Sequence, residues 1–356
     1  MDLALSNLAR KFVSVLSFYS SDSNLAPLSF TSRARIQFAF DHAWADSTLS
    51  KYRGVVAQFH SFCDAENIPC NLCLPASEDL LCGFAASRVC SIAGSTVKSQ
   101  LAALKAWHVY NNAPWLGGAR LRYVLHGVEN LTPLPLRCPP RPPITRNMLC
   151  LLASNLSRTD PLDVCCLAAA TCAMWGQLRL GEILSQWEFS FVASKISCRH
   201  HLQPPFNTNG SRILHLPFTK VTKSKGDDVC ICRQSDGSDP IAALTSHLHI
   251  NNPPPNVPLF SFRSPNGWRC LTKKKLLLRC NAMIWLHFGI PSSTGHSFRI
   301  GSTTEFLLSG VPPDVVKSLG RWSSDAFLRY WRSLELLAPL HVENITTPAT
   351  SSSLHV

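Results

Sequence analysis

Two neighbouring stretches, Gly-His-Ser-Phe-Arg at 295–299 and Leu-Gly-Arg-Trp-Ser-Ser-Asp-Ala-Phe-Leu-Arg-Tyr at 319–330, decide how this chain is expected to fold. His296 and Arg299 are three residues apart, so at the start of a helix they lie on one face. Tyr330 follows in a later, glycine-led helix. Taken alone, a His-x-x-Arg pair is more often solvent-facing, and a lone tyrosine more often packs half-buried. The pattern becomes specific only through what precedes it.

Two upstream segments complete the pattern. Gln-Leu-Arg-Leu-Gly-Glu at 177–182 contains Arg179 and, three residues on, Glu182. About forty residues later, Phe-Thr-Lys-Val-Thr-Lys at 218–223 places Lys220 in a lysine-rich turn. Lys223 and Lys225 in the same turn are close competitors for the role of Lys220.

These residue types suit the cleavage and rejoining of a DNA strand. A tyrosine can attack a phosphodiester and conserve its bond energy in a covalent intermediate. Planar arginines fit the charged non-bridging oxygens, a histidine of near-neutral pKa can accept the phenol proton, and a lysine can protonate the leaving oxygen. We therefore expect neither a metal nor a cofactor, because side chains supply the cations.

The charge balance favours a polyanionic partner. The chain of 356 residues has 34 Lys+Arg against 22 Asp+Glu, a net charge of +12 and a pI near 9.2. Residues 240–304 contain no Asp or Glu, and this span should project a positive field. Charge alone is equally compatible with a merely basic soluble protein.

Fifteen cysteines do not predict a disulfide scaffold, because a chain this long can build a core without one. Several lie in apolar helical patterns, where a free thiol acts as a small hydrophobe. Cys70 and Cys73 have metal-like spacing, but no second pair follows at zinc-finger distance. We expect a reducing intracellular compartment, the nucleus if the source is eukaryotic.

No membrane partner is expected, since no apolar run reaches the roughly 18 residues that span a bilayer. The N-terminus lacks a convincing signal-peptide core. Its serine-rich, acid-poor composition leaves a transit peptide open.

Hydrophobic periodicity predicts a first, all-helical domain over residues 36–130, after a tail or loosely docked helix at 1–35. Its helices are expected at 49–63, 78–89, 96–110 and 119–129. Residues 131–143 then contain six prolines with Arg137 and Arg141, which indicates a stiff linker. A basic linker would suit a clamp around a duplex, and a plain spacer is the alternative.

The second domain is expected over 144–342, before a disordered tail at 343–356. Short strands are predicted at 213–218 and 229–232 on either side of the lysine-rich turn. Helices are predicted at 146–155, 162–175, 272–288, 296–308, 313–319 and 325–337, with a helical turn beginning at 179–182. The predicted fold class is therefore mainly α with a small β-sheet.

The residues quoted above resemble the tyrosine recombinase (phage integrase) family over roughly residues 40–340, most strongly from Arg179 to Tyr330. The form of 295–301 and 319–330 looks most like recombinases of eukaryotic, especially fungal, mobile elements. The resemblance implies a C-shaped clamp made of a helical, SAM-like core-binding domain and a mixed α+β catalytic domain. It also implies site-specific recombination or integration of double-stranded DNA through a 3′-phosphotyrosyl intermediate, by a homotetramer on paired sites.

The family's roles transfer residue by residue. Arg179 matches the first arginine, with Glu182 as its support, and Lys220 matches the hairpin lysine. His296 and Arg299 match the third and fourth members, and Tyr330 matches the nucleophile.

One position departs from the family pattern. The slot nine residues before the tyrosine usually carries His or Trp, and here it is Arg321. We expect Trp322 to fill that role after a one-residue adjustment, with its indole N–H donating to the phosphate. The alternative is that Trp322 is a core anchor.

Other basic residues are candidates for contacts to the DNA backbone, which position a protein on DNA without reading its sequence. The alternative for each is an ordinary surface charge that is solvated and contacts no DNA. They are Lys51, Arg53, Lys98 and Lys105 in the first domain, and Lys223, Lys225 and Lys273 in the second.

Three other functions fit parts of this pattern. A type IB topoisomerase would use the same chemistry as a monomer. A decayed mobile-element protein would bind DNA without cutting it. A basic scaffold of RNA complexes would neither cut strands nor depend on Arg299. The apolar segment 331–340 could dock on a neighbouring subunit or pack within its own chain.

Overall fold

The computed structural model describes residues 28–137 and 139–330, which divide into two compact units between Pro139 and Pro140. The division falls within the proline-rich stretch 131–143. The expected tail 343–356, the docking segment 331–340 and the end of the last predicted helix lie outside the described residues. No helix in the described part is long and apolar enough to cross a membrane.

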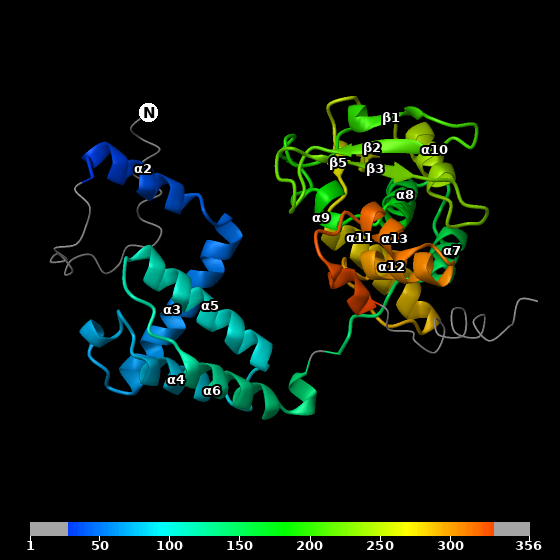
Figure 1. Cartoon of the computed structure of the whole chain (residues 1–356). Helices are drawn as coiled ribbons and strands as arrows, with labels where there is room; N and C mark the ends of the chain where they lie inside the picture. The colour runs from blue at the N-terminus through cyan, green and yellow to red at the C-terminus, as the bar shows by residue number, and fades with distance from the viewer. Residues whose placement is uncertain (1–27, 138, 331–356) are drawn as a thin grey trace, which may run out of the picture. The chain divides into compact units, whose positions relative to one another are not determined.

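The first unit is helical (Figure 1). Its α-helices are α2 (Phe30–Asp41), α3 (Asp46–Ala65), α4 (Glu78–Ala86), α5 (Gly94–Tyr110) and α6 (Ala119–Asn130), and two short 3-10 turns are η1 (Cys70–Leu72) and η2 (Leu134–Leu136). Ser77 caps α4, with its hydroxyl accepting from the backbone N–H of Leu80 at 3.1 Å. Helix α2 runs across the expected boundary at residue 35.

Aromatic side chains fill the core of this unit. The ring of Phe59 meets those of Phe84 and Trp107 edge-on, with centroids 5.3 and 6.2 Å apart. Helix α2 buries no residue and is tied to α5 by a hydrogen bond from the Tyr110 hydroxyl to Asp41 at 2.8 Å. The α2 helix is therefore held by polar contacts rather than by core packing.

The second unit is built around α8 (Pro161–Trp175), which is apolar on all sides and buried over most of its length. Three antiparallel strands in the order β1 (Leu202–Pro205), β2 (Arg212–Leu216) and β3 (Asp227–Ile231) form a small sheet. In Figure 1 this sheet and helices α12 and α13 lie on opposite sides of α8. The end of α8 approaches β3 closely, since a Cβ on Gly176 would lie 2.8 Å from Ile231.

The second unit contains further helices, turns and one hairpin. They are α7 (Arg146–Asn155), α9 (Leu180–Ile183), the 3-10 turn η3 (Arg199–His201), α10 (Pro240–Ile250), the hairpin β4 (Ser261–Ser264) and β5 (Gly267–Cys270), α11 (Lys273–Cys280), the irregular turns η4 (Asn281–Trp285) and η5 (Leu286–Phe288), α12 (Ser297–Leu308), α13 (Pro313–Leu319) and the 3-10 helix η6 (Asp325–Tyr330).

The predicted fold class is confirmed, with specific differences. Strand β1, the β4–β5 hairpin and α10 were not predicted. The two predicted strands begin one or two residues earlier than expected, at Arg212 and Asp227. The helix expected over 272–288 changes to π and then 3-10 geometry after Cys280. Each missed strand has four residues, which leaves too little alternation to detect.

Candidate active site

The first arginine is fixed at the start of α9. After α8 ends, Gln177 adopts a left-handed backbone conformation with φ of 48°, which redirects the chain into Arg179. The Arg179 guanidinium donates to Glu182 Oε1 at 2.7 Å, and its backbone N–H donates to Glu182 Oε2 at 3.0 Å. Glu182 is buried, so this pairing sets the direction of the Arg179 side chain.

Arg299 lies on α12 and is 0% exposed. One of its terminal nitrogens donates to the carbonyl of Gly320, whereas Nε and Nη1 have no hydrogen-bond partner among the described residues. Burial, and then the nearby charges of Arg179 and Arg321, lower its pKa to about 9. The group therefore remains a cation at neutral pH, and an oxyanion would satisfy its unused donors.

Arg321, the residue that departs from the family pattern, belongs to the same cluster. Its guanidinium donates to Glu182 Oε2 at 3.1 Å and lies 3.8 Å from Asp227 Oδ2 at the start of β3. Its backbone is left-handed, with φ of 54°. Burial lowers its pKa, against the raising effect of Glu182 and Asp227. The buried Glu182 thus supports a second arginine that was not assigned a role from sequence.

Trp322 covers the Arg299 guanidinium. The centre of that guanidinium lies 4.1 Å from the Trp322 indole centroid. The Tyr330 ring centroid lies 5.6 Å from the same indole centroid. The indole Nε1 is buried, has no partner among the described residues and lies against Gly320. This geometry suits an anchor over Arg299, and donation from the indole to a phosphate stays a prediction.

Tyr330 meets His296 at the end of η6. The Tyr330 hydroxyl lies 2.5 Å from His296 Nε2, and the Tyr330 carbonyl accepts from Thr304 Oγ1 at 3.5 Å. The tyrosine ring is 9% exposed and packs in a small apolar cluster with Ile300 and Phe327. The Tyr330 ring and the Arg299 guanidinium both lie against the Trp322 indole.

The structure does not bring the lysine-rich turn into contact with this cluster. Lys220, Lys223 and Lys225 are exposed between β2 and β3. A reciprocal pair of backbone hydrogen bonds between Thr219 and Lys223 closes the turn. The base of the turn does reach the cluster, because Asp227 begins β3 and faces Arg321.

Lys273 lies closer to the cluster than its sequence position suggested. It begins α11, and a Cβ built on Gly295 would lie 2.7 Å from its Cε and 3.3 Å from its Nζ. The same position would be 3.0 Å from Leu180, next to Arg179. The Lys273 side chain is thus packed on the turn that carries His296, and no sequence spacing could have shown this.

The first-domain candidates are exposed on their helices. Lys51 and Arg53 lie on α3, and Lys98 and Lys105 on α5. Lys98 is paired with Glu129 at 2.5 Å, a surface ion pair of small energetic value. Nothing in their surroundings separates DNA contacts from ordinary solvated charge. Among the described residues, no cluster of His, Cys, Asp and Glu could hold a metal ion.

Comparison with known proteins gives similarity in solved structures alone. No family model matches the chain, and no curated protein does. XerH site-specific recombinase bound to a palindromic difH substrate matches with a TM-score of 0.54 and 11% identity, covering 89% of this chain and 83% of that one. Tn1549 transposon integrase in complex with transposon right-end DNA also has a TM-score of 0.54, with 13% identity and coverage of 88% and 98%.

A second XerH complex, captured before cleavage, matches with a TM-score of 0.52 and 13% identity, covering 94% of this chain and 93% of that one. Sequence identity this low shows only that the folds are similar. The chain has the mainly helical fold, with a small antiparallel sheet, that is found in tyrosine recombinase and integrase structures.

Proposed function

We propose that this chain breaks and rejoins DNA strands through a covalent tyrosyl phosphodiester. One observation carries the proposal. The Tyr330 hydroxyl is hydrogen-bonded to His296 at 2.5 Å beside a fully buried Arg299 that has unused N–H donors. A nucleophile, a base for its proton and an unsatisfied cation at one place are what attack on a phosphodiester requires.

In the proposed step the Tyr330 oxygen forms a bond to phosphorus while its proton passes to His296 Nε2. The bond between phosphorus and the 5′ oxygen breaks, and that oxygen leaves as a hydroxyl after taking a proton from Lys220. Arg179 and Arg299 hold the non-bridging oxygens. Rejoining reverses each transfer, since the 5′ hydroxyl attacks and the phenol recovers its proton.

Lys220 is exposed in the turn whose base reaches Arg321 through Asp227. Bending of this turn on DNA would carry Lys220 to the leaving oxygen. Exposure of the lysine before binding is compatible with this role, because catalytic contacts commonly tighten only in the substrate complex.

The wider assignment is a site-specific recombinase or integrase of a mobile element, in the style of eukaryotic elements, acting as a homotetramer on paired DNA sites. The basic composition supports a DNA partner. Two of the solved structures with this fold are described as bound to recombination or transposon-end DNA. Arg321 in place of the usual His or Trp would be a variation of this chain.

Covalent capture tests the proposal. Nicked suicide duplexes of random sequence prevent rejoining, so an active enzyme accumulates as a protein–DNA adduct that survives denaturation. The full-length protein should form this adduct, and Tyr330→Phe should not. If neither protein forms it while both still bind DNA, the chain is a binding protein and the enzymatic proposal fails.

A topology assay distinguishes the recombinase from a topoisomerase. Relaxation of supercoiled plasmid without any site requirement would favour the monomeric topoisomerase. A requirement for the sequences recovered in the adducts, placed as a pair, supports recombination.

The role of Lys220 has its own test. Lys220→Ala should slow cleavage, and a duplex with sulfur at the 5′ bridging position should restore the rate because a thiolate leaves without a proton. Lys225→Ala is the matched control in the same turn. Failure of the sulfur substrate to rescue Lys220→Ala would reject this lysine as the general acid.

A further inference from the structure

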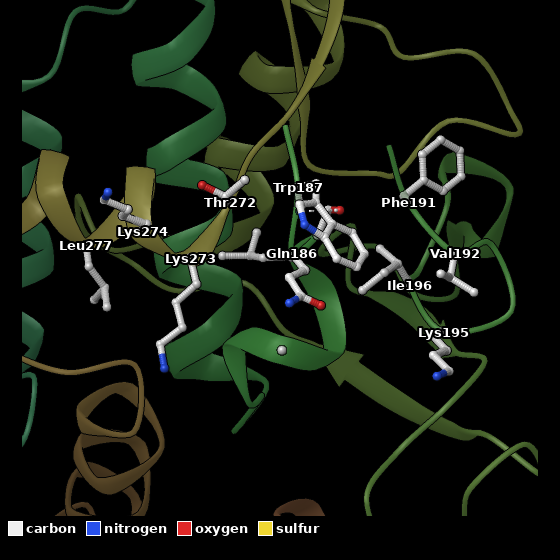
Figure 2. A pocket seen from close by; sticks show the side chains of 13 residues that line it. Gln186, Trp187, Phe191, Val192, Lys195, Ile196, Thr272, Lys273, Lys274 and Leu277 are labelled. Atoms are coloured by element: carbon white, nitrogen blue, oxygen red, sulfur yellow. Dashed lines mark hydrogen bonds between the residues drawn. The ribbon is translucent and has the colours of Figure 1, made fainter. Parts of the chain in front are cut away.

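A pocket of about 670 Å³ opens beside the candidate active site in the second unit (Figure 2). Its volume lies within the roughly 300–1,000 Å³ of typical small-ligand sites. Trp187, Phe191 and Ile196 supply apolar surface, and Lys195, Lys273 and Lys274 contribute the charged groups. None of the described residues that line it is acidic, so its charge suits an anionic ligand with a flat apolar part.

The pocket is lined by residues that adjoin the candidate active site. Gly181, on one wall, lies in the α9 turn between Arg179 and Glu182. Lys273, on another wall, packs on Gly295 next to His296. A strand held at its phosphate by Arg179 and Arg299 would therefore have an adjacent nucleotide at the mouth of this pocket.

The aromatic lining is accessible. Trp187 is 54% exposed even though it is a large apolar side chain. Figure 2 shows its indole between the start of α11, with Lys273 and Lys274, and the segment that carries Phe191, Val192 and Lys195. Exposed aromatic rings next to lysines are the surface on which single-stranded bases stack.

We propose that this pocket receives one unpaired, unstacked base of the DNA strand next to the phosphodiester that is cut. The inference rests on the proposed function and names a part of the substrate for which no residue had been assigned. Trp187 stacks on the base, and Lys273 and Lys274 contact its flanking phosphates. Gln186, which also lines the pocket, supplies an amide that can hydrogen-bond to a base edge.

The test compares two labelled duplexes of the same sequence, one fully paired and one with a single bulged nucleotide, by fluorescence anisotropy at fixed salt. All proteins carry Tyr330→Phe, so that the result does not depend on cleavage. The parent protein should bind the bulged duplex at least about tenfold more tightly, in line with base–aromatic stacking. Trp187→Ala should reduce that ratio to about one, and Trp187→Phe should retain most of it.

Phe189→Ala is the matched control. Phe189 is 76% exposed in the same segment but is not part of the pocket lining. This variant should leave the ratio unchanged. Equal affinity of the parent for both duplexes, or a ratio that survives Trp187→Ala, overturns the proposal, whether or not the tyrosine-containing enzyme forms covalent adducts.

A second copy of this chain is the other candidate occupant of the pocket. Sedimentation of the same proteins tests it by measuring self-association. If Trp187→Ala abolishes self-association and leaves the duplex preference intact, the pocket is a subunit contact and the base proposal fails. Cross-linking of a 5-iodouracil placed at the bulge to a peptide containing Trp187 would support the base proposal directly.

Discussion

The Arg299 guanidinium is buried at a cost that the described residues do not fully offset. Its side chain is 0% exposed, and two of its three nitrogens have no partner within residues 28–137 and 139–330. Unpaired buried charge is expensive, and the lowering of its pKa to about 9 expresses the same cost. The proposed function explains this arrangement, because the unused N–H donors of Arg299 can bind a non-bridging oxygen of the phosphodiester.

Arg299→Met should therefore separate stability from activity. We expect cleavage to fall by on the order of 3 kcal/mol or more of transition-state stabilisation, which is at least about a hundredfold. We expect the midpoint of thermal unfolding to stay level or rise, because the unpaired charge is gone. Calorimetry and adduct formation on the same preparation measure both. A large drop in the midpoint would show that Arg299 is needed for folding.

Single residues also show which parts of the site could be predicted from the sequence and which could not. The order and spacing of Arg179, Glu182, His296, Arg299 and Tyr330 resembled a family pattern, and that resemblance implied that they meet. Local spacing alone does not fix contacts between segments that are distant in the sequence. The approach of Lys273 to Gly295 depends on how α11 packs on the α12 turn. The burial of the Trp322 indole against Gly320 depends likewise on the left-handed backbone of Arg321.

At the scale of elements, the long helices were predictable from periodicity and caps, whereas short strands were not. The hydroxyls of Thr145 and Thr272 accept hydrogen bonds of 3.2 Å from backbone N–H groups at the starts of α7 and α11. A threonine at such a position is a recognisable helix start. Helix α10 begins at Asp239–Pro240, a recognisable start, yet it was overlooked within the acid-free span. Strands β4 and β5 have four residues each, so their pairing arises from tertiary context.

Close approach of two elements makes Gly301 irreplaceable. A Cβ on this residue of α12 would collide with the carbonyl of Ile144, where the chain enters α7. Gly301→Ala should destabilise the second unit by several kcal/mol, about the cost of overpacking a core. Gly127→Ala in α6, where a Cβ meets nothing within 4 Å, is the control and should stabilise by about 0.5–1 kcal/mol. Denaturant titration of both variants checks this, and equal effects would contradict it.

His247 couples α10 to the β4 hairpin and makes that packing sensitive to acid. Its Nε2 donates to the Leu259 carbonyl at 2.8 Å, and its Nδ1 accepts from Asn251 at 3.0 Å. Burial lowers its pKa from 6.5 to about 4. The unfolded chain therefore binds the proton more readily, and the stabilisation is complete above pH 6.5 and is lost as the pH falls toward 4.

The loss attributable to His247 should approach about 3 kcal/mol across that range, at 1.36 kcal/mol for each unit of pKa shift. In His247→Gln, which keeps a donor for Leu259, this part of the pH dependence should disappear. Urea unfolding measured at several values between pH 4 and pH 7 tests the difference. Parallel curves for the two proteins would mean that other groups control acid unfolding.

At the scale of the whole molecule, the two units have separate cores. Apolar clusters around Phe59 and around Leu178 share no residue, and the division falls between Pro139 and Pro140. The proline content of 131–143 made this stretch recognisable as a candidate linker.

Because the two units have separate cores, we expect the second unit to fold without the first. Residues 140–356 alone should unfold cooperatively, with a midpoint matching one of two transitions of the full chain. Differential scanning calorimetry of both proteins makes the comparison. A fragment without a cooperative transition would show that the first unit is needed to complete the second.

The position of Tyr330 has a consequence for the homotetramer proposed above. The phenol meets His296 of its own polypeptide, and its backbone carbonyl accepts from Thr304 of the same chain. Each protomer would then sever only the strand gripped by its own guanidinium groups. A mixture of Tyr330→Phe and Arg299→Met proteins should consequently show no complementation in adduct assays, whereas nucleophile donation in trans would restore activity in such hybrids.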